Sequence, residues 1–304
     1  CRHMSTHKTE LTLSDAKDFL SGYFNDDVTS VSEIGGGETS KAFFFKLKDA
    51  DYVLRVNSHG KENYLKDKFA YQNFTSQNIP IPEVIEIGDV NESLSFCITK
   101  KCSGITLDQL DEATNKLLVP KVVAALLEVH QLKVPGTGYG NWGSSGNGRF
   151  KSWNEFLNAS LGTDEDKLKN VLFYDKDLRD KLKFRIKELI KYCPEERVVI
   201  HDDFGFNNTL SDGRKITGVI DWEESIYGDP VRDLARLELW GSEYGFTAEY
   251  KKQSKRLGIK LQNFERRLEC YKLMIALGSL WFYAYSNQEE SYRNMVVTVE
   301  GLGI

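Results

Sequence analysis

The sequence lacks any apolar run that approaches the ~20 residues needed to cross a bilayer, and no signal-peptide pattern opens it. It has only five cysteines, which form neither a Cys-x-x-Cys pair nor a cysteine–histidine cluster with the spacing of a metal site. Residues 1–4 are typical of a cloning remnant, so we expect the native chain to start at Met4. These absences predict a cytoplasmic protein with reduced thiols.

An excess of basic residues is also missing. The chain has 40 lysines and arginines against 45 aspartates and glutamates, which gives a formal net charge of −5. General nucleic-acid binders are usually basic, so this balance argues against a nucleic-acid partner. A mildly acidic protein suits a cationic small molecule. We expect a monomer that binds neither nucleic acid nor membranes.

What the sequence does contain is an ordinary globular composition over 304 residues, which is enough for two lobes. Its first part combines strand-like runs with two stretches of helical periodicity. The predicted helices are residues 11–24 and 61–77, and the predicted strands are residues 28–34, 42–47, 52–56, 83–89 and 93–99. This order predicts a small antiparallel sheet in an N-terminal lobe, residues 5–99.

After Gly104 the pattern becomes helical. The predicted helices are residues 119–132, 153–161, 175–192, 230–244 and about 262–286, with a loop at 135–148 and a short hairpin near 207–221. The predicted fold class is therefore α+β, with two lobes. A hinge at residues 100–104 would join the N-terminal lobe to a larger helical lobe, residues 105–304.

The most informative stretch reads His-x-Asp-x-x-x-x-Asn from His201 to Asn208, and Asp221 follows a later apolar run. Asp203 has the chemistry to accept a proton from a substrate hydroxyl, while Asn208 and Asp221 have oxygen atoms that could hold magnesium against nucleotide phosphates. Helix-cap and turn roles are the alternative for Asp203 and Asn208. Against that alternative, a buried acid at a strand end is costly unless it is paired or binds a cation. We expect His201 to be structural.

A glycine-rich turn and a strand cation could contact the phosphates. The turn contains Gly35, Gly36, Gly37 and Ser40. Its flexible backbone could donate N–H groups, although an ordinary hairpin turn is the alternative and no Walker A sequence follows. Arg55 lies one strand later and could reach the α- and β-phosphates, held by Asp67 or Glu62 from the next helix. An exposed strand cation is the alternative for Arg55.

Acids and aromatic residues after Asp221 are candidates for the acceptor site. They are Trp222, Glu223, Glu238 and Trp240. Such side chains suit an ammonium-bearing or polyhydroxylated ligand, and a charged helix face is the alternative. In the segment Gly-Asp-Pro that opens the next helix, Asp229 is expected to act as a cap. Asp229 and Asp233 could also anchor the catalytic loop from beneath.

These motifs resemble the aminoglycoside phosphotransferase family, which has a protein-kinase-like fold, over nearly the whole chain. His201-x-Asp203-x4-Asn208 is similar to the catalytic loop of that family, and Ile220-Asp221-Trp222 is similar to its metal-binding segment. The resemblance implies that Asp203 is the catalytic base and that Asn208 and Asp221 bind Mg²⁺. It implies a protein-kinase-like arrangement of the two predicted lobes.

The resemblance also implies the substrates. The donor would be ATP, with GTP as the alternative. The adenine would meet the hinge backbone at Lys100, Lys101 and Cys102, with Thr99 just before it. The acceptor would be a hydroxyl of an aminoglycoside-type antibiotic such as hygromycin B. Most of the family has Lys where this chain has Arg55, whereas hygromycin-type members resemble it in having Arg, a planar fork rather than a point charge. Two other readings stay open: a metabolic kinase for an amino alcohol or sugar, and a non-catalytic nucleotide-binding module.

Overall fold

The computed structural model describes residues 9–25, 28–35, 40–134, 136–143, 146–162 and 165–304. The described chain divides into two compact units. The sheet unit comprises residues 9–110 and 206–223, and the helical unit comprises residues 111–205 and 224–304. The limits predicted for the two lobes and the hinge remain predictions. Residues 206–223 belong to the sheet unit, although they lie far along the chain from its other residues.

Five antiparallel strands form the main sheet of the sheet unit, in the order β1-β2-β3-β5-β4. They are β1 (Val28–Ile34), β2 (Ser40–Leu47), β3 (Ala50–Asn57), β4 (Val84–Asp89) and β5 (Ser95–Lys100). All five predicted strands are confirmed, with ends that differ by no more than two residues. The antiparallel sheet of the predicted α+β fold is confirmed with them.

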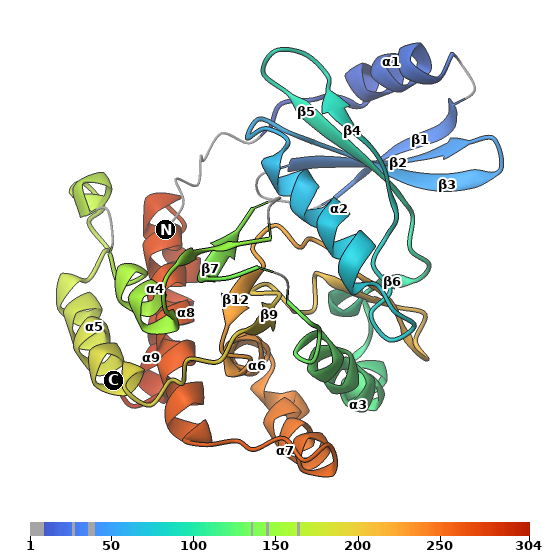
Figure 1. Cartoon of the computed structure of the whole chain (residues 1–304). Coiled ribbons are helices and arrows are strands. Elements are labelled where there is room, and N and C mark those ends of the chain that lie inside the picture. Colours follow the sequence, from blue (N-terminus) through green and yellow to red (C-terminus); the bar gives the residue numbers. More distant parts are fainter. Residues whose placement is uncertain (1–8, 26–27, 36–39, 135, 144–145, 163–164) are drawn as a thin grey trace. The chain divides into compact units, whose positions relative to one another are not determined.

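Helices α1 (Leu13–Phe24) and α2 (Glu62–Phe74) cover opposite faces of this sheet (Figure 1). On one face, Ala16 and Leu20 of α1 belong to the same buried apolar cluster as Leu54 and Val56 of β3. Successive side chains of a strand point to opposite faces. Arg55 therefore points to the face that carries α2.

The hairpin predicted near residues 207–221 is confirmed. Strand β10 (Thr209–Ser211) pairs with β11 (Ile216–Val219) and with β6 (Ile105–Thr106) in a three-stranded antiparallel sheet. Gly104 permits the close approach before β6, because its φ is +86° and a Cβ there would lie 2.2 Å from the carbonyl oxygen of Ser211. Glycine is thus required where β6 joins the hairpin.

The helical unit is organised around α8 (Phe264–Tyr285), which packs against three other helices (Figure 1). These are α5 (Lys176–Ile190), α6 (Val231–Trp240) and α9 (Glu289–Gly301), and the remaining helices are α3 (Glu112–Val129), α4 (Trp153–Ala159) and α7 (Phe246–Arg256). The helical character predicted for this part of the chain is confirmed. None of the helices in the described ranges is both long and apolar enough to span a bilayer.

Two predictions for the helical unit were wrong in detail. Helix α3 begins seven residues before the predicted start at residue 119, because the Asp111 side chain accepts the Thr114 N–H and caps the helix there. Helices α7 and α9 were not predicted, since each buries only a narrow stripe of side chains. In α7 that stripe is Phe246, Tyr250 and Ser254.

The predicted loop at 135–148 is also a correction. It contains β7 (Tyr139–Trp142) and ends at β8 (Gly148–Phe150), which form one sheet with β9 (Val198–Ile200) and β12 (Ile226–Gly228). Strands this short carry little periodicity of their own. Their pairing depends on partners far away in the sequence, such as Tyr227 of β12 opposite Gly140 of β7.

Candidate active site

The β10–β11 hairpin brings two predicted site residues to the same end of a sheet. The Ile220 N–H donates to the Asn208 carbonyl oxygen at 3.0 Å, one step beyond the paired Thr209 and Val219. Asn208 is buried, whereas the Asp221 side chain is 43% exposed. Asp221 has φ +65°, a left-handed conformation that aspartate adopts more readily than most residues. The hairpin thus brings Asn208 and the accessible carboxylate of Asp221 to the same end of the sheet.

Arg55 joins this end of the hairpin to helix α2. Its guanidinium pairs with the carboxylate of Asp67, and its Nη1 atom lies 3.9 Å from Oδ1 of Asp221. Burial acts to lower the pKa of Arg55, but Asp67 raises this pKa well above its ordinary value, so the charge is retained. Asp67 also accepts the Trp222 N–H at 2.9 Å. Glu62 is exposed at the start of α2, so the partner of Arg55 is Asp67.

The donor atoms of Asn208 and Asp221 fit magnesium. Mg²⁺ prefers hard oxygen ligands and is usually bound by one or two protein carboxylates or amides, with water and substrate phosphates completing its octahedron. One amide and one carboxylate at one end of a hairpin match that requirement. Across the described ranges, no group of three or more His, Cys, Asp or Glu side chains could hold a metal ion by itself. A magnesium ion at this pair would need further ligands, such as water or substrate oxygens.

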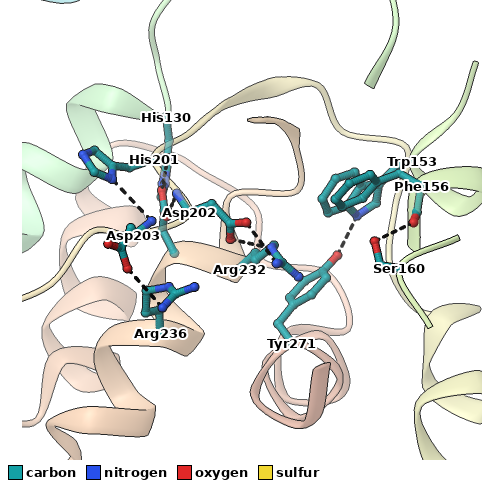
Figure 2. A network of polar contacts seen from close by, with 11 residues as sticks. His130, Trp153, Phe156, Ser160, His201, Asp202, Asp203, Arg232, Arg236 and Tyr271 are labelled. Atoms are coloured by element: carbon teal, nitrogen blue, oxygen red, sulfur yellow. Dashed lines mark hydrogen bonds and ion pairs between the residues drawn. The ribbon is translucent and has the colours of Figure 1, made fainter. Parts of the chain in front are cut away.

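The loop that carries Asp203 belongs to the helical unit and is fixed from below by α6. The buried carboxylate of Asp233 accepts the N–H groups of His201 at 2.9 Å and Asp202 at 2.8 Å. His201 is fully buried, and its Nδ1 atom accepts the Asp203 N–H at 3.3 Å. These contacts agree with the structural role expected for His201, which supports the backbone of the loop from inside the protein. Figure 2 shows His201, Asp202 and Asp203 above the α6 residues Arg232 and Arg236.

Asp202 and Asp203 each form an ion pair with an arginine of α6 (Figure 2). Asp202 has φ +61°, and Arg232 holds its carboxylate through two nitrogens at 2.6 and 3.0 Å. Asp203 contacts Nη1 of Arg236 at 3.1 Å, and a third of its side chain is exposed. The loop therefore presents Asp203 to solvent while its backbone is held rigidly.

Asp233 also lies 3.2 Å from Nε2 of His130. Burial acts to raise the pKa of Asp233, but the contact with His130 and the His201 N–H lower it, and the net pKa lies below its ordinary value. The carboxylate therefore stays ionised under the loop. Asp233 thus holds the backbone of the loop at His201 and Asp202, which agrees with the anchoring role expected for it.

Asp229 has a different partner. Its carboxylate pairs with Arg267 and accepts the Tyr271 hydroxyl at 2.6 Å, and both partners come from α8. The Tyr271 hydroxyl in turn accepts the indole N–H of Trp153 at 2.8 Å (Figure 2). Asp229 also accepts the Val231 N–H at 3.0 Å, which is the capping role expected. It fastens the start of α6 to α8 and does not bind the catalytic loop.

The predicted nucleotide residues occupy varied places in the sheet unit. Gly35 directly follows β1 and Ser40 begins β2, whereas Gly36 and Gly37 lie outside the described residues. Thr99, just before the predicted hinge, is buried on β5, and Lys100 of the hinge pairs with Glu83. The Lys101 N–H donates to the Asp51 carbonyl, and burial raises the pKa of the Cys102 thiol to about 11.

The predicted acceptor residues are less exposed than a ligand-binding rim would be. The Trp222 side chain is fully buried and its indole N–H donates to the Val219 carbonyl at 3.1 Å, while the backbone carbonyl of Glu223 accepts from Lys66. Glu238 is 9% exposed and its carboxylate accepts the Thr247 N–H at the start of α7. Trp240 is 44% exposed. Of these four side chains, Trp240 is the one the structure leaves most open.

Sequence reasoning missed Arg232 and Arg236. Their spacing of four residues on α6 was an available signal, because side chains at i and i+4 lie on one helix face. Asp233 lies between them on the same stretch of helix. A helix face with the order Arg, Asp and Arg is suited to bind a loop that contains two acids and backbone N–H donors.

Comparison with known proteins places the chain among kinases. A family model described as the phosphotransferase enzyme family matches residues 30–267. Hygromycin-B 4-O-kinase of Escherichia coli is 33% identical over 278 residues, which cover 90% of this chain and 80% of that protein.

Solved structures agree with this result. Aminoglycoside phosphotransferase APH(4)-Ia superposes with a TM-score of 0.82 at 29% identity, covering 96% of this chain and 98% of that one. A thermostable mutant of the same protein, in ternary complex with ADP and hygromycin B, is 29% identical, gives a TM-score of 0.80 and covers 94% of this chain and 96% of that one. The GDP and kanamycin complex of APH(2")-IIIa, 17% identical with a TM-score of 0.68 and coverage of 95% and 98%, shares the fold. These neighbours have the protein-kinase-like fold that the motifs predicted.

Proposed function

Since the chain belongs to the phosphotransferase enzyme family, we propose that it transfers the γ-phosphoryl group of ATP to a hydroxyl of an aminoglycoside, with hygromycin B as an acceptor. The observation that carries this proposal is the similarity to hygromycin-B 4-O-kinase along most of the chain. Residues 30–267, which match the family model, contain every residue proposed below for catalysis and phosphate binding. Inactivation of the antibiotic would make the bearer resistant.

Asp203 is the proposed catalytic base. It orients the acceptor hydroxyl and accepts its proton as the new oxygen–phosphorus bond forms and the bond to the departing ADP breaks. The exposed part of its carboxylate and the fixed backbone beneath it support this role. Because the reacting groups need positioning and charge stabilisation, the proposal involves no covalent enzyme intermediate.

Asn208 and Asp221 are the proposed magnesium ligands, and bound magnesium would neutralise the phosphate oxygens during transfer. Arg55 supplies a second positive charge at the same end of the hairpin, where its ion pair with Asp67 fixes the guanidinium. The turn from Gly35 to Ser40 is proposed to donate N–H groups to the phosphates. Residues 99–102 are proposed to bind the base.

The proposal also covers the phosphoryl donor, the cellular location and the residues that contact the acceptor. ATP is the proposed donor, since a relative is solved with ADP and hygromycin B, and GTP is the alternative. We propose a cytoplasmic monomer with a small-molecule substrate and no nucleic-acid partner. Among the acceptor candidates, Trp240 is favoured by its exposure. Trp222, Glu223 and Glu238 would contribute through their placement of neighbouring backbone.

A panel assay tests the proposal. ATP consumption is measured with hygromycin B, other aminoglycosides, and cellular amino alcohols and sugars as acceptors, and the product is identified by mass spectrometry. We expect a phosphorylated aminoglycoside, and we expect Asp203→Ala to abolish its formation while nucleotide binding persists. Phosphorylation of an amino alcohol alone would favour a metabolic kinase. Undiminished turnover by Asp203→Ala would remove Asp203 from the mechanism.

A further inference from the structure

Helix α6 meets the catalytic loop through three residues that act on three successive loop positions. Asp233 accepts the N–H groups of His201 and Asp202, and Arg232 pairs with the Asp202 carboxylate. Arg236, one turn further along α6, reaches the carboxylate of the next loop residue, Asp203. The first two contacts hold the backbone and a buried side chain, whereas the third touches the proposed base itself.

We propose that Arg236 is a positioning residue for the phosphoryl transfer, which sets the orientation of the Asp203 carboxylate. This inference rests on the proposed function. An aspartate side chain has two rotatable bonds, so a fixed backbone alone does not set the orientation of its carboxylate. The contact between Nη1 of Arg236 and Oδ1 of Asp203, at 3.1 Å, restricts that orientation.

The form of the contact suits positioning. Arg232 grips Asp202 through two nitrogens, an arrangement that directs both carboxylate oxygens toward the guanidinium. Arg236 approaches Asp203 with Nη1 at 3.1 Å, and a third of the Asp203 side chain stays exposed. One oxygen can thus be fixed while the carboxylate still reaches an acceptor hydroxyl.

Arg236 itself is well placed to stay fixed. Only 24% of its side chain is exposed, and its Nε atom is buried. A guanidinium that is partly enclosed loses little further rotamer freedom on pairing, unlike the two long exposed side chains of an ordinary surface ion pair. The alternative is that the pair is such an ordinary contact with no influence on the reaction.

The experiment compares Arg236→Gln, which removes the charge, with Arg236→Lys, which keeps it. Arg293→Gln is the matched control, because Arg293 pairs with Glu289 on the exposed surface of α9. We expect Arg236→Gln to lower kcat by about ten- to a hundredfold, with KM for ATP changed by less than about twofold. Lysine should restore most of the rate if the positive charge beside Asp203 is what orients the carboxylate. The control should behave as the unmodified protein.

A double-mutant cycle separates positioning from a structural role. In an Asp203→Asn background, Arg236→Gln should change the residual rate by less than about twofold, because residues that act as one unit are not additive. An equal loss with and without Asp203, or an unchanged kcat in Arg236→Gln, would overturn the inference. So would a loss explained entirely by a smaller folded fraction in thermal melts.

The same variants separate this inference from the proposed function. Hydrolysis of ATP by water, measured without an acceptor, also needs an oriented nucleophile. If the unmodified enzyme phosphorylates no aminoglycoside, the proposed acceptor is wrong, and ATP hydrolysis then decides the role of Arg236. If the antibiotic is phosphorylated at the same rate by Arg236→Gln, the proposed function holds and the inference fails.

Discussion

Replacing Asp233 by Asn tests how the catalytic loop is held in place. The fully buried carboxylate accepts two backbone N–H groups, from His201 and Asp202, and contacts His130. An Asn side chain of equal size offers one acceptor oxygen and turns an NH₂ group toward the other N–H. One charge-assisted hydrogen bond is then lost and one buried donor is unsatisfied. The first costs ~1.5–3 kcal/mol and the second ~1–3 kcal/mol, so we expect the unfolding free energy to fall by ~3–5 kcal/mol.

Asp229→Asn is the matched control, since Asp229 is equally buried at the start of the same helix but binds Arg267 and Tyr271. Urea unfolding and kcat are measured for both variants at a temperature where each is folded. Both should lose stability, and only Asp233→Asn should lose about tenfold or more in kcat per folded molecule. Equal losses of kcat in the two variants, or full activity in Asp233→Asn, would refute the assignment of loop anchoring to Asp233.

The same carboxylate predicts a pH dependence. The pKa of Asp233 in the folded protein lies below the ordinary 3.8, despite burial, because of His130 and the His201 N–H. A carboxylate with a depressed pKa contributes stability above its unfolded pKa, and that contribution is lost as the pH falls through the folded value. Unfolding free energies measured from pH 6 to 3 should therefore decline below about pH 4. The decline should be shallower in Asp233→Asn, and equal slopes would contradict this reasoning.

The remaining predictions concern the sheet unit. Asp67→Ala leaves the Arg55 guanidinium without its main partner; because 19% of the Arg55 side chain is exposed, we expect a loss of ~2–3 kcal/mol, the low end for a buried pair, in urea unfolding, and a raised KM for ATP. Gly104→Ala should cost ~2–4 kcal/mol, since it places a Cβ against the Ser211 carbonyl at positive φ; a stability equal to that of the unmodified protein would show that β6 can shift away. Cys102, with a pKa of about 11, should react slowly with iodoacetamide near neutral pH, and its rate, followed by mass spectrometry, should still rise above pH 9, where an ordinary thiol has levelled off.

Local spacing predicted much of the fold. The five strands of the sheet unit and the β10–β11 hairpin follow from short-range alternation and turn residues, which act within a few positions of one another. The short strands β7 and β9 were not predicted, because strands of three or four residues carry little periodicity and both pair with the distant strand β12. Helix α3 extended beyond its predicted start because a single cap at Asp111 decided the boundary.

For the site, local spacing predicts which residues carry the chemistry, and their roles are proposed above. The pattern is local: it runs from His201 through Asp203 and Asn208 to Asp221, which follows a strand. Asn208 and Asp221 come together because the short strands between them, β10 and β11, pair as a hairpin. The sequence left open whether Asp67 or Glu62 meets Arg55. The packing of α2 on the sheet decided for Asp67, since this buried helix position faces the partly buried cation while Glu62 is exposed.

Tertiary structure alone decided how these residues are held and which candidates are enclosed. The contact of Arg236 with Asp203 and the burial of Trp222 depend on segments that are far apart in the sequence. Glu238 reads as an acceptor residue in the sequence, yet its carboxylate caps the neighbouring helix α7. Residue type and spacing fix what a side chain is able to do, but the partner it finds depends on which elements pack against it.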